Sequence, residues 1–117
     1  KVLFLRSKGK EAFYSPGGKR DPGETDIEAL VREIKEEVDV KLLKETIKYI
    51  ETFKAQAHGK PEGVLVEIKC YSGEYEGILT PSNEIEELDW LTSRDMHRTG
   101  DPGKLILKWL KEKNLID

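Results

Sequence analysis

Residues 18–40, with the sequence GKRDPGETDIEALVREIKEEVDV, constrain the fold of this chain more than any other stretch. Thr25 is a favourable N-cap, and Glu28 three residues later completes a capping box that fixes the first turn of a helix. Apolar residues then recur at helical spacing: Ile27, Leu30, Val31, Ile34 and Val38. One side of this helix must therefore be covered by a hydrophobic core that the rest of the chain supplies.

The same helix gathers acidic residues on a different side. At about 100° per residue, Glu33, Glu36 and Glu37 fall together, and their mutual repulsion destabilises the helix unless a cation offsets it. Divalent ions such as Mg²⁺ take oxygen ligands and commonly bridge carboxylates to a phosphate. Pro16-Gly17-Gly18 lies just before the helix, so its backbone can approach the same ion or phosphate closely. The pattern therefore indicates a metal and phosphate site.

Arg32 lies four residues before Glu36 and can also reach back to Glu24. We interpret it as a strut that keeps the acidic side chains in order, rather than as a substrate contact. On charge alone, a run of Glu and Lys on a helix is more often a solvated face. Charge by itself therefore leaves both interpretations open.

The full pattern resembles the signature of the Nudix hydrolase family, which is G, five residues, E, seven residues, then R-E-U-x-E-E-x-G-U with U aliphatic. The matching positions hold Gly18, Glu24, Arg32, Glu33, Ile34, Glu36, Glu37 and Val40. Asp39 stands where the family has glycine, and we expect it to end the helix in a left-handed conformation, which Asp tolerates better than most residues. The resemblance implies an α+β fold, an α/β/α sandwich in which a mixed sheet lies between the box helix and a C-terminal helix.

The resemblance also implies an activity: metal-dependent hydrolysis of a diphosphate linkage in a nucleoside diphosphate joined to another group. Mg²⁺, with Mn²⁺ as an alternative, is the implied cofactor. The family pattern makes Glu33 and Glu37 direct ligands and Glu36 a third ligand or one reached through water. The Gly17 carbonyl would complete the shell, while Glu24 would be structural support for Arg32.

A further glutamate from a later loop supplies the general base or another ligand in mutator-type family members. Glu84 stands where that residue is expected, with Glu86 and Glu87 as close competitors. A strand would send Glu84 and Glu86 to one face and Glu87 to the other. An ordinary exposed loop carboxylate is the alternative for Glu84. The choice of general base between Glu33 and Glu84 stays open, and the catalytic set expected from the resemblance is Arg32, Glu33, Glu36, Glu37 and Glu84.

Substrate contacts are predicted at the glycine loop and beside it, at Tyr14, Gly17, Gly18 and Lys19. Arg20 could meet phosphates and His58 could touch substrate, although both are equally typical of exposed turns. Tyr71, Phe53 and Trp90 could stack on a base, but aromatic residues on strands more often belong to the core.

The prediction of the substrate rests on the absence of residues that are typical of two other substrate classes. Family members that cleave ADP-ribose or diadenosine polyphosphates tend to carry a proline or a tyrosine beyond the box, and residues 53–58 contain neither. This favours a mutator-like housecleaning enzyme that converts nucleoside triphosphates to monophosphate and pyrophosphate. An ADP-ribose or nucleotide-sugar pyrophosphatase is the alternative. A non-catalytic nucleotide-binding module and an acidic structural domain are the competing classes.

Composition limits the partners. The 117 residues suffice for one core, so we expect a single Nudix domain over 1–117, with a strand that usually precedes residues 2–5 missing. A net charge of −3 and a pI near 5.5 argue against a nucleic acid polymer or an anionic membrane as partner. Cys70 cannot form an internal disulfide, and no signal peptide or membrane-length apolar stretch is evident. We expect a cytoplasmic monomer or homodimer acting on a small nucleotide.

Patterns along the rest of the chain predict strands over 1–6, 40–43, 47–57, 64–72 and 85–91, with an edge piece at 78–79. Residues 73–77 should interrupt the sheet, and 58–63 should form a hairpin tip. A final helix is predicted over 101–113, with Leu105, Ile106, Trp109 and Leu110 on its buried side. Cys70, in an alternating strand, is expected to be a buried structural thiol.

Overall fold

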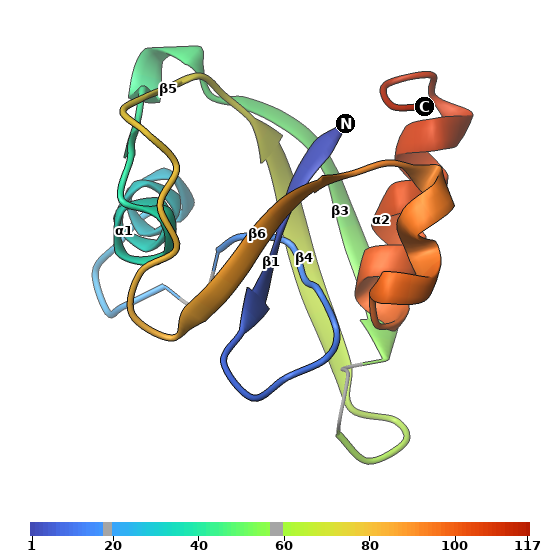
Figure 1. Ribbon diagram of the computed structural model, residues 1–117. Coiled ribbons are helices and arrows are strands. Elements are labelled where there is room, and N and C mark those ends of the chain that lie inside the picture. Colours follow the sequence, from blue (N-terminus) through green and yellow to red (C-terminus); the bar gives the residue numbers. More distant parts are fainter. Residues whose placement is uncertain (18–19, 57–59) are drawn as a thin grey trace.

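The computed structural model describes residues 1–17, 20–56 and 60–117. Its strands and helices are β1 (Val2–Ser7), α1 (Asp26–Val38), β2 (Lys41–Leu42), β3 (Lys48–Gln56), β4 (Leu65–Ser72), β5 (Tyr75–Glu76), β6 (Ile85–Leu91) and α2 (Asp101–Glu112), with 3₁₀ helices at Lys44–Thr46 and Ser93–Arg98. The strands lie between α1 on one side and α2 on the other (Figure 1). The predicted mixed α/β fold with a C-terminal helix is confirmed.

Helix α1 begins and ends as its sequence predicts. The Glu28 N–H donates to the Thr25 hydroxyl at 3.1 Å, and the Thr25 N–H donates to the Glu28 carboxylate at 2.9 Å, which completes the capping box. Asp39 has φ 56° and donates its N–H to the Lys35 carbonyl, while its carboxylate pairs with the Lys35 ammonium at 2.7 Å. Aspartate therefore fills the left-handed position of the family glycine with an extra local ion pair.

The strands form three antiparallel pairs, β1–β6, β3–β4 and β2–β5, where a single mixed sheet was expected. One parallel bridge joins Phe13 to Thr99. The predicted edge piece at 78–79 is wrong by a few residues, because Tyr75 and Glu76 form the short strand instead. Gly77 follows with φ 114° and turns the chain away, which leaves Ile78 85% exposed.

Two hydrophobic clusters lie beneath the helices, one under α2 and one under α1. The cluster under α2 contains Phe4, Phe13, Phe53, Leu91, Ile106, Leu107, Leu110 and Ile116. The cluster under α1 contains Leu5, Ile34, Val38, Val40 and Ile85. The buried side of α2 is rotated from the prediction: Leu107 is fully buried and Leu105 is exposed, because Ile106, Leu107 and Leu110 are the α2 side chains in the cluster, with Trp109 packed against it. On α1, Ala29, Ile34 and Val38 are buried, and Ile27, Leu30 and Val31 are half-buried.

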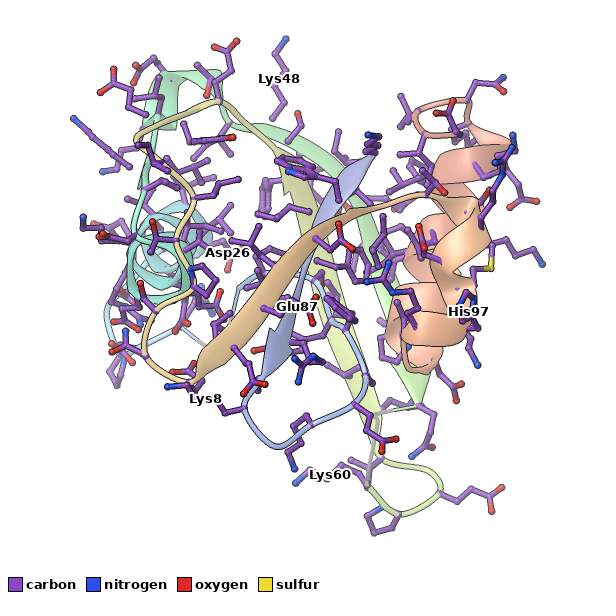
Figure 2. The ribbon with its side chains drawn as sticks, in the orientation of Figure 1. Lys8, Asp26, Lys48, Lys60, Glu87 and His97 are labelled. Carbon is purple, nitrogen blue, oxygen red and sulfur yellow. The ribbon has the colours of Figure 1, made fainter. Side chains whose placement is uncertain are left out.

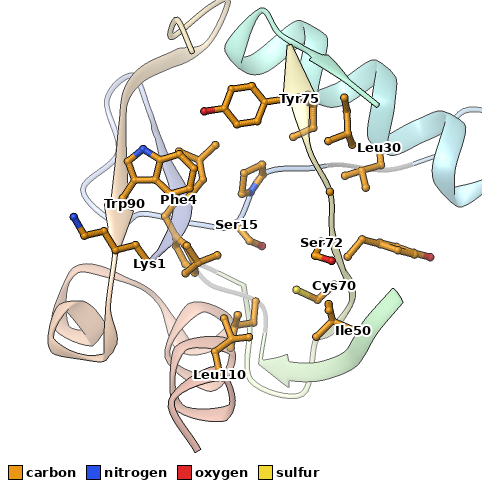
Figure 3. A pocket seen from close by; sticks show the side chains of 18 of the residues that line it. Lys1, Phe4, Ser15, Leu30, Ile50, Cys70, Ser72, Tyr75, Trp90 and Leu110 are labelled. Atoms are coloured by element: carbon orange, nitrogen blue, oxygen red, sulfur yellow. The ribbon is translucent and has the colours of Figure 1, made fainter. Parts of the chain in front are cut away.

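An apolar cavity of about 510 Å³ lies between the two clusters, and Phe4, Leu30, Ile50, Cys70, Trp90 and Leu110 are among its lining residues (Figure 3). Burial raises the pKa of the Cys70 thiol, which favours the structural role predicted for it. Phe53 is a core residue that meets Trp109 edge-on at 5.7 Å between ring centroids. Within the described ranges, none of the helices has the length and apolar character that a membrane crossing requires.

Candidate active site

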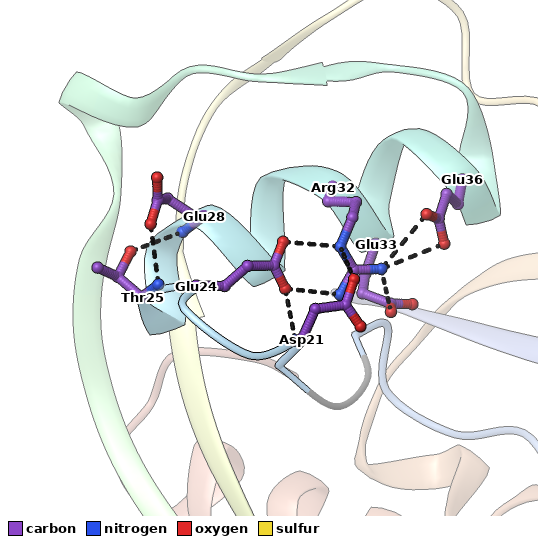
Figure 4. A network of polar contacts seen from close by, with 7 residues as sticks. All are labelled: Asp21, Glu24, Thr25, Glu28, Arg32, Glu33 and Glu36. Carbon is purple, nitrogen blue, oxygen red and sulfur yellow. Dashed lines mark hydrogen bonds and ion pairs between the residues drawn. The ribbon is translucent and has the colours of Figure 1, made fainter.

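Arg32 is the centre of an ion-pair network along α1 and the turn before it (Figure 4). Its Nε and Nη2 donate to the two carboxylate oxygens of Glu24 at 2.8 and 2.9 Å. Its Nη1 donates to Glu33 at 2.8 Å and to Glu36 at 3.3 Å. The contacts predicted for a strut, back to Glu24 and forward to Glu36, are present. A catalytic role for Arg32 stays a prediction.

Glu24 is held as an anion by this network. The Arg32 guanidinium, and secondly the Asp21 N–H that donates to it at 2.7 Å, lower the pKa of the Glu24 carboxyl to about 2. In turn, hydrogen bonds from Arg32 to Glu24 and Glu33 raise the pKa of Arg32. Both Glu24 oxygens are engaged by Arg32, as the predicted pairing requires, and the supporting role implied for Glu24 by the family pattern stays a prediction.

Glu37 is the buried carboxyl of the helix, and only 3% of it is exposed. The sequence placed it with Glu33 and Glu36 on a face away from the core, and the structure corrects this: Glu36 is exposed, Glu33 half-buried and Glu37 buried. Burial raises the pKa of Glu37 to about 7, against the lowering effect of the Gly17 N–H. The nearby charges of Glu33, Glu84 and Glu36 are smaller contributions to this raised value.

Gly17 approaches Glu37 through its backbone. Its N–H donates to Glu37 Oε1 at 2.9 Å, and its φ of 124° is one that side-chain-bearing residues rarely adopt. The amide therefore joins this loop to the acidic helix, and the predicted approach of the loop to an ion or phosphate stays a prediction. The role predicted for the Gly17 carbonyl stays a prediction. Gly18, Lys19 and His58 lie outside the described residues.

Glu84 is brought to the same region by the loop that precedes β6. The N–H groups of Thr80 and Ser82 donate to the carbonyls of Val38 and Glu37, both at 2.9 Å. The side chain of Asn83 donates to the carbonyl of Glu36 at 2.6 Å. This loop therefore rests on the last turn of α1. Sequence reasoning missed Asn83, and its only signal was a position one residue before a candidate carboxylate.

Glu86 and Glu87, the competitors of Glu84, are engaged elsewhere. Both pair with Arg6, at 3.3 and 3.1 Å. The prediction that they point to opposite faces is wrong, because the register of β6 against β1 shifts between Arg6 and Ser7 and leaves Glu86 as the extra residue of a bulge. Both carboxylates therefore lie at Arg6, and the choice of Glu84 over them stays a prediction.

Tyr14 lies beside the acidic residues. Its ring packs against the cluster under α1, and its hydroxyl is 2.7 Å from the Ser7 hydroxyl. Burial raises the pKa of the Tyr14 phenol, and the charges of Glu37, Glu84 and Glu33 raise it further. The phenol therefore shares the surroundings of the three carboxylates, whereas a nucleobase contact was predicted. That contact stays a prediction.

A broad groove of about 1260 Å³ begins at Gly17 and Tyr14. Its basic lining residues are Lys10, Arg20, Lys60, Lys69, His97 and Arg98. Figure 2 labels three of the lining residues, Asp26, Lys60 and His97, which come from α1, the β3–β4 hairpin and the 3₁₀ helix before α2. Asp26 pairs with Lys69 at 3.0 Å and with Arg20 at 3.4 Å. Glu11 and Glu67 also line the groove, so its wall carries charges of both signs beside the glycine loop.

The family model described as the NUDIX domain matches residues 1–110. The chain belongs to the Nudix family. A Chromobacterium violaceum protein assigned to the nudix hydrolase family is 25% identical, with a TM-score of 0.70 over 94% of this chain and 67% of that one. The MutT protein of Bacillus halodurans is 25% identical, with a TM-score of 0.66 over 91% and 71%. The E. coli ORF135 protein, 21% identical with a TM-score of 0.68 over 98% and 84%, shares the fold.

A search of curated proteins finds no match. The Nudix assignment nevertheless confirms the family and the general activity predicted from the sequence, since Nudix hydrolases are pyrophosphohydrolases. The geometry of Glu33, Glu36 and Glu37 in the Nudix box can therefore be compared with what this hydrolysis requires.

The carboxylate oxygens of the Nudix box are the type of ligand that a hard divalent cation prefers. Within the described residues, no group of three or more acidic, histidine or cysteine side chains is arranged to share an ion. The box carboxylates do not form such a group because those of Glu33 and Glu36 both turn toward Arg32. Glu37, by contrast, is buried among like charges and accepts from one amide. A cation beside Glu37 would offset the cost of that buried charge, so the oxygen donors present suit Mg²⁺.

Proposed function

We propose that this chain hydrolyses the diphosphate bridge of a nucleoside diphosphate derivative, and that nucleoside triphosphates are its main substrates, giving monophosphate and pyrophosphate. The observation that carries the proposal is the hydrogen bond of the buried Glu37 carboxyl, on which the charges of Glu33, Glu36 and Glu84 act, to Gly17, which also lines the groove described above. The likeness to a protein named MutT supports the triphosphate choice.

In this proposal Glu33, Glu36, Glu37 and the Gly17 carbonyl hold Mg²⁺, with Mn²⁺ able to replace it. When bound, the ion neutralises charge on the phosphate oxygens and lowers the pKa of the attacking water. Glu24 keeps Arg32 paired through two hydrogen bonds, so Glu33 and Glu36 can turn from Arg32 toward an ion without leaving the guanidinium alone.

The chain's other residues complete the chemistry. Glu84 or Glu33 takes a proton from the water that attacks phosphorus, since each acts electrostatically on the same buried carboxyl. Gly17, Gly18 and Lys19 contact the phosphates, and the groove beyond Tyr14 receives the nucleoside. Positioning and charge neutralisation therefore provide most of the rate enhancement, as is general for phosphoryl chemistry.

The test is a panel of nucleoside triphosphates, ADP-ribose and nucleotide sugars incubated with Mg²⁺, with pyrophosphate and monophosphate products measured separately. We expect pyrophosphate release from at least one triphosphate and a loss of at least about 100-fold in kcat for Glu37→Gln. Cleavage of ADP-ribose or a nucleotide sugar without pyrophosphate from any triphosphate would overturn the substrate choice. Nucleotide binding without turnover of any compound would overturn the hydrolase proposal and favour a binding module.

A further inference from the structure

The end of α1 is completed by a segment far away in the sequence. The last carbonyls of an α-helix have no partner within the helix. Here the carbonyls of Glu37 and Val38 accept N–H groups of Ser82 and Thr80, and the carbonyl of Glu36 accepts the side-chain amide of Asn83. The loop of residues 80–84 is therefore attached to the same helical turn that carries two of the proposed metal ligands.

Asn83 differs from the other members of this loop because it acts through its side chain. Its Nδ2 lies 2.6 Å from the Glu36 carbonyl oxygen, the shortest of the three contacts to the helix. Its φ of 54° is left-handed, a conformation that Asn tolerates better than most residues. The conformation and the hydrogen bond together set the direction in which the chain leaves toward Glu84.

The backbone of Glu84 is held on its other side as well. Its carbonyl accepts the N–H of Lys8, in the turn after β1, at 2.8 Å, and the Ile85 N–H donates to the Ser82 carbonyl at 3.0 Å. Glu84 is thus fixed between the end of α1 and the end of β1. The charge of Glu84 contributes to the raised pKa values of both Glu37 and Tyr14.

We propose that Asn83 is a positioning residue for Glu84: its hydrogen bond to the Glu36 carbonyl holds the Glu84 loop against α1, so that Glu84 stays at the end of the helix that carries Glu36 and Glu37. This inference rests on the proposed hydrolase function. It adds a residue outside the Nudix box whose effect on catalysis passes through Glu84. Asn83 itself contacts helix backbone, and touches neither substrate nor ion in this role.

The test compares Asn83→Gly with Asn114→Gly. Glycine keeps the left-handed conformation and removes only the side-chain amide. Asn114 is the matched control, because it also has a left-handed φ, 57°, and lies after α2, away from the carboxylates. We expect Asn83→Gly to lower kcat about tenfold with KM changed less than about twofold, and Asn114→Gly to leave kcat unchanged.

A double-mutant cycle with Glu84→Gln separates positioning from general destabilisation. If Asn83 acts through Glu84, Asn83→Gly should change kcat less than about twofold in the Glu84→Gln background. Each variant is assayed well below its own melting temperature. Should Asn83→Gly fail to fold, Asn83→Asp replaces it, since Asp tolerates the same backbone conformation and lacks the amide donor.

The outcomes are distinguishable. An unchanged kcat in Asn83→Gly, or a tenfold loss that persists in the Glu84→Gln background, overturns the positioning role and leaves the hydrolase proposal intact. Absence of turnover by the unsubstituted chain removes the proposed function, and the role of Asn83 with it. A kcat loss confined to the background that retains Glu84 supports the inference.

Discussion

The amide of Gly17 and the carboxyl of Glu37 are joined by a 2.9 Å hydrogen bond that links the glycine loop to the buried side of α1. The two residues are 20 positions apart in sequence. The contact places a backbone with no side chain against the one carboxyl of the Nudix box that is buried. Its consequences for stability and activity can be measured separately.

The first prediction concerns pH. The pKa of Glu37 is raised from 4.5 to about 7 by burial, so the folded protein retains a proton that the unfolded chain loses. The favourable contribution of protonated Glu37 to the free energy of unfolding is fully present below about pH 4.5 and is lost as pH rises through about 7. Without divalent ions, Glu37→Gln should therefore stabilise the protein at pH 8 by up to roughly 3 kcal/mol. Urea denaturation in EDTA at pH 5 and pH 8 measures this.

The matched control for that experiment is Glu45→Gln, at an exposed position in the 3₁₀ helix Lys44–Thr46. It should preserve the pH dependence of the unsubstituted chain. If Glu37→Gln shows the same decline between pH 5 and pH 8 as the control, Glu37 is not the group responsible, and its burial carries no such cost.

The second prediction concerns Gly17→Ala. A Cβ at this position meets nothing nearer than Leu30 at 4.0 Å, so the strain comes from the φ of 124°. We expect a loss of about 1–3 kcal/mol in stability and a large loss of activity, because the amide moves from Glu37. Gly63→Ala, at φ 92° with open space around it, should lose similar stability and keep its activity. Equal activities in the two variants would argue against a role for the Gly17 loop in catalysis.

The third prediction concerns Mg²⁺ binding. An ion that binds only the folded protein stabilises it by about 2.7 kcal/mol at 100 times its Kd. We expect Mg²⁺ to raise the melting temperature at pH 8, and to do so much less in Glu37→Gln. Calorimetric scans with and without Mg²⁺ provide the measurement. An identical melting temperature in both conditions would favour an acidic structural domain without an ion.

The fourth prediction concerns Glu24→Gln. Glu24 occupies two donors of Arg32, and its neutralisation should leave the guanidinium more fully engaged by Glu33 and Glu36. Arg32 then competes with the ion for these carboxylates. We expect the Mg²⁺ concentration for half-maximal activity to rise about tenfold. The measurement is a titration of activity with Mg²⁺, with Glu45→Gln as the control. If Glu24→Gln and Glu45→Gln both needed the same Mg²⁺ concentration for half-maximal activity as the unsubstituted chain, competition by Arg32 would be contradicted.

Local features were predictable from the sequence because their causes are local. Thr25 and Glu28 cap α1 through contacts three residues apart, and Asp39 ends it in the conformation that its side chain tolerates. The pairing of Arg32 with Glu24 follows from the spacing of a helix and the turn before it. The Nudix box is contained within one such segment, so the family and its general chemistry were visible without a structure.

The remaining features depend on contacts between distant segments. The burial of Glu37 arises from the Gly17 loop and the strands, and helical spacing alone grouped it with the exposed Glu36. The pairing of Glu86 and Glu87 with Arg6 depends on a bulge, which alternation does not predict. Asn83 has no motif around it, and only the docking of its loop on α1 reveals its contact.

That docking has a consequence for how the site is made. The hydrogen bond from Asn83 reaches back 47 residues to the carbonyl of Glu36. A peptide spanning residues 20–40 would lack every one of these partners, and its final turn would fray in water. The geometry of the proposed ligands therefore depends on contacts between distant segments, and hydrogen exchange at the amides of Ser82 and Thr80 should report how stable this docking is.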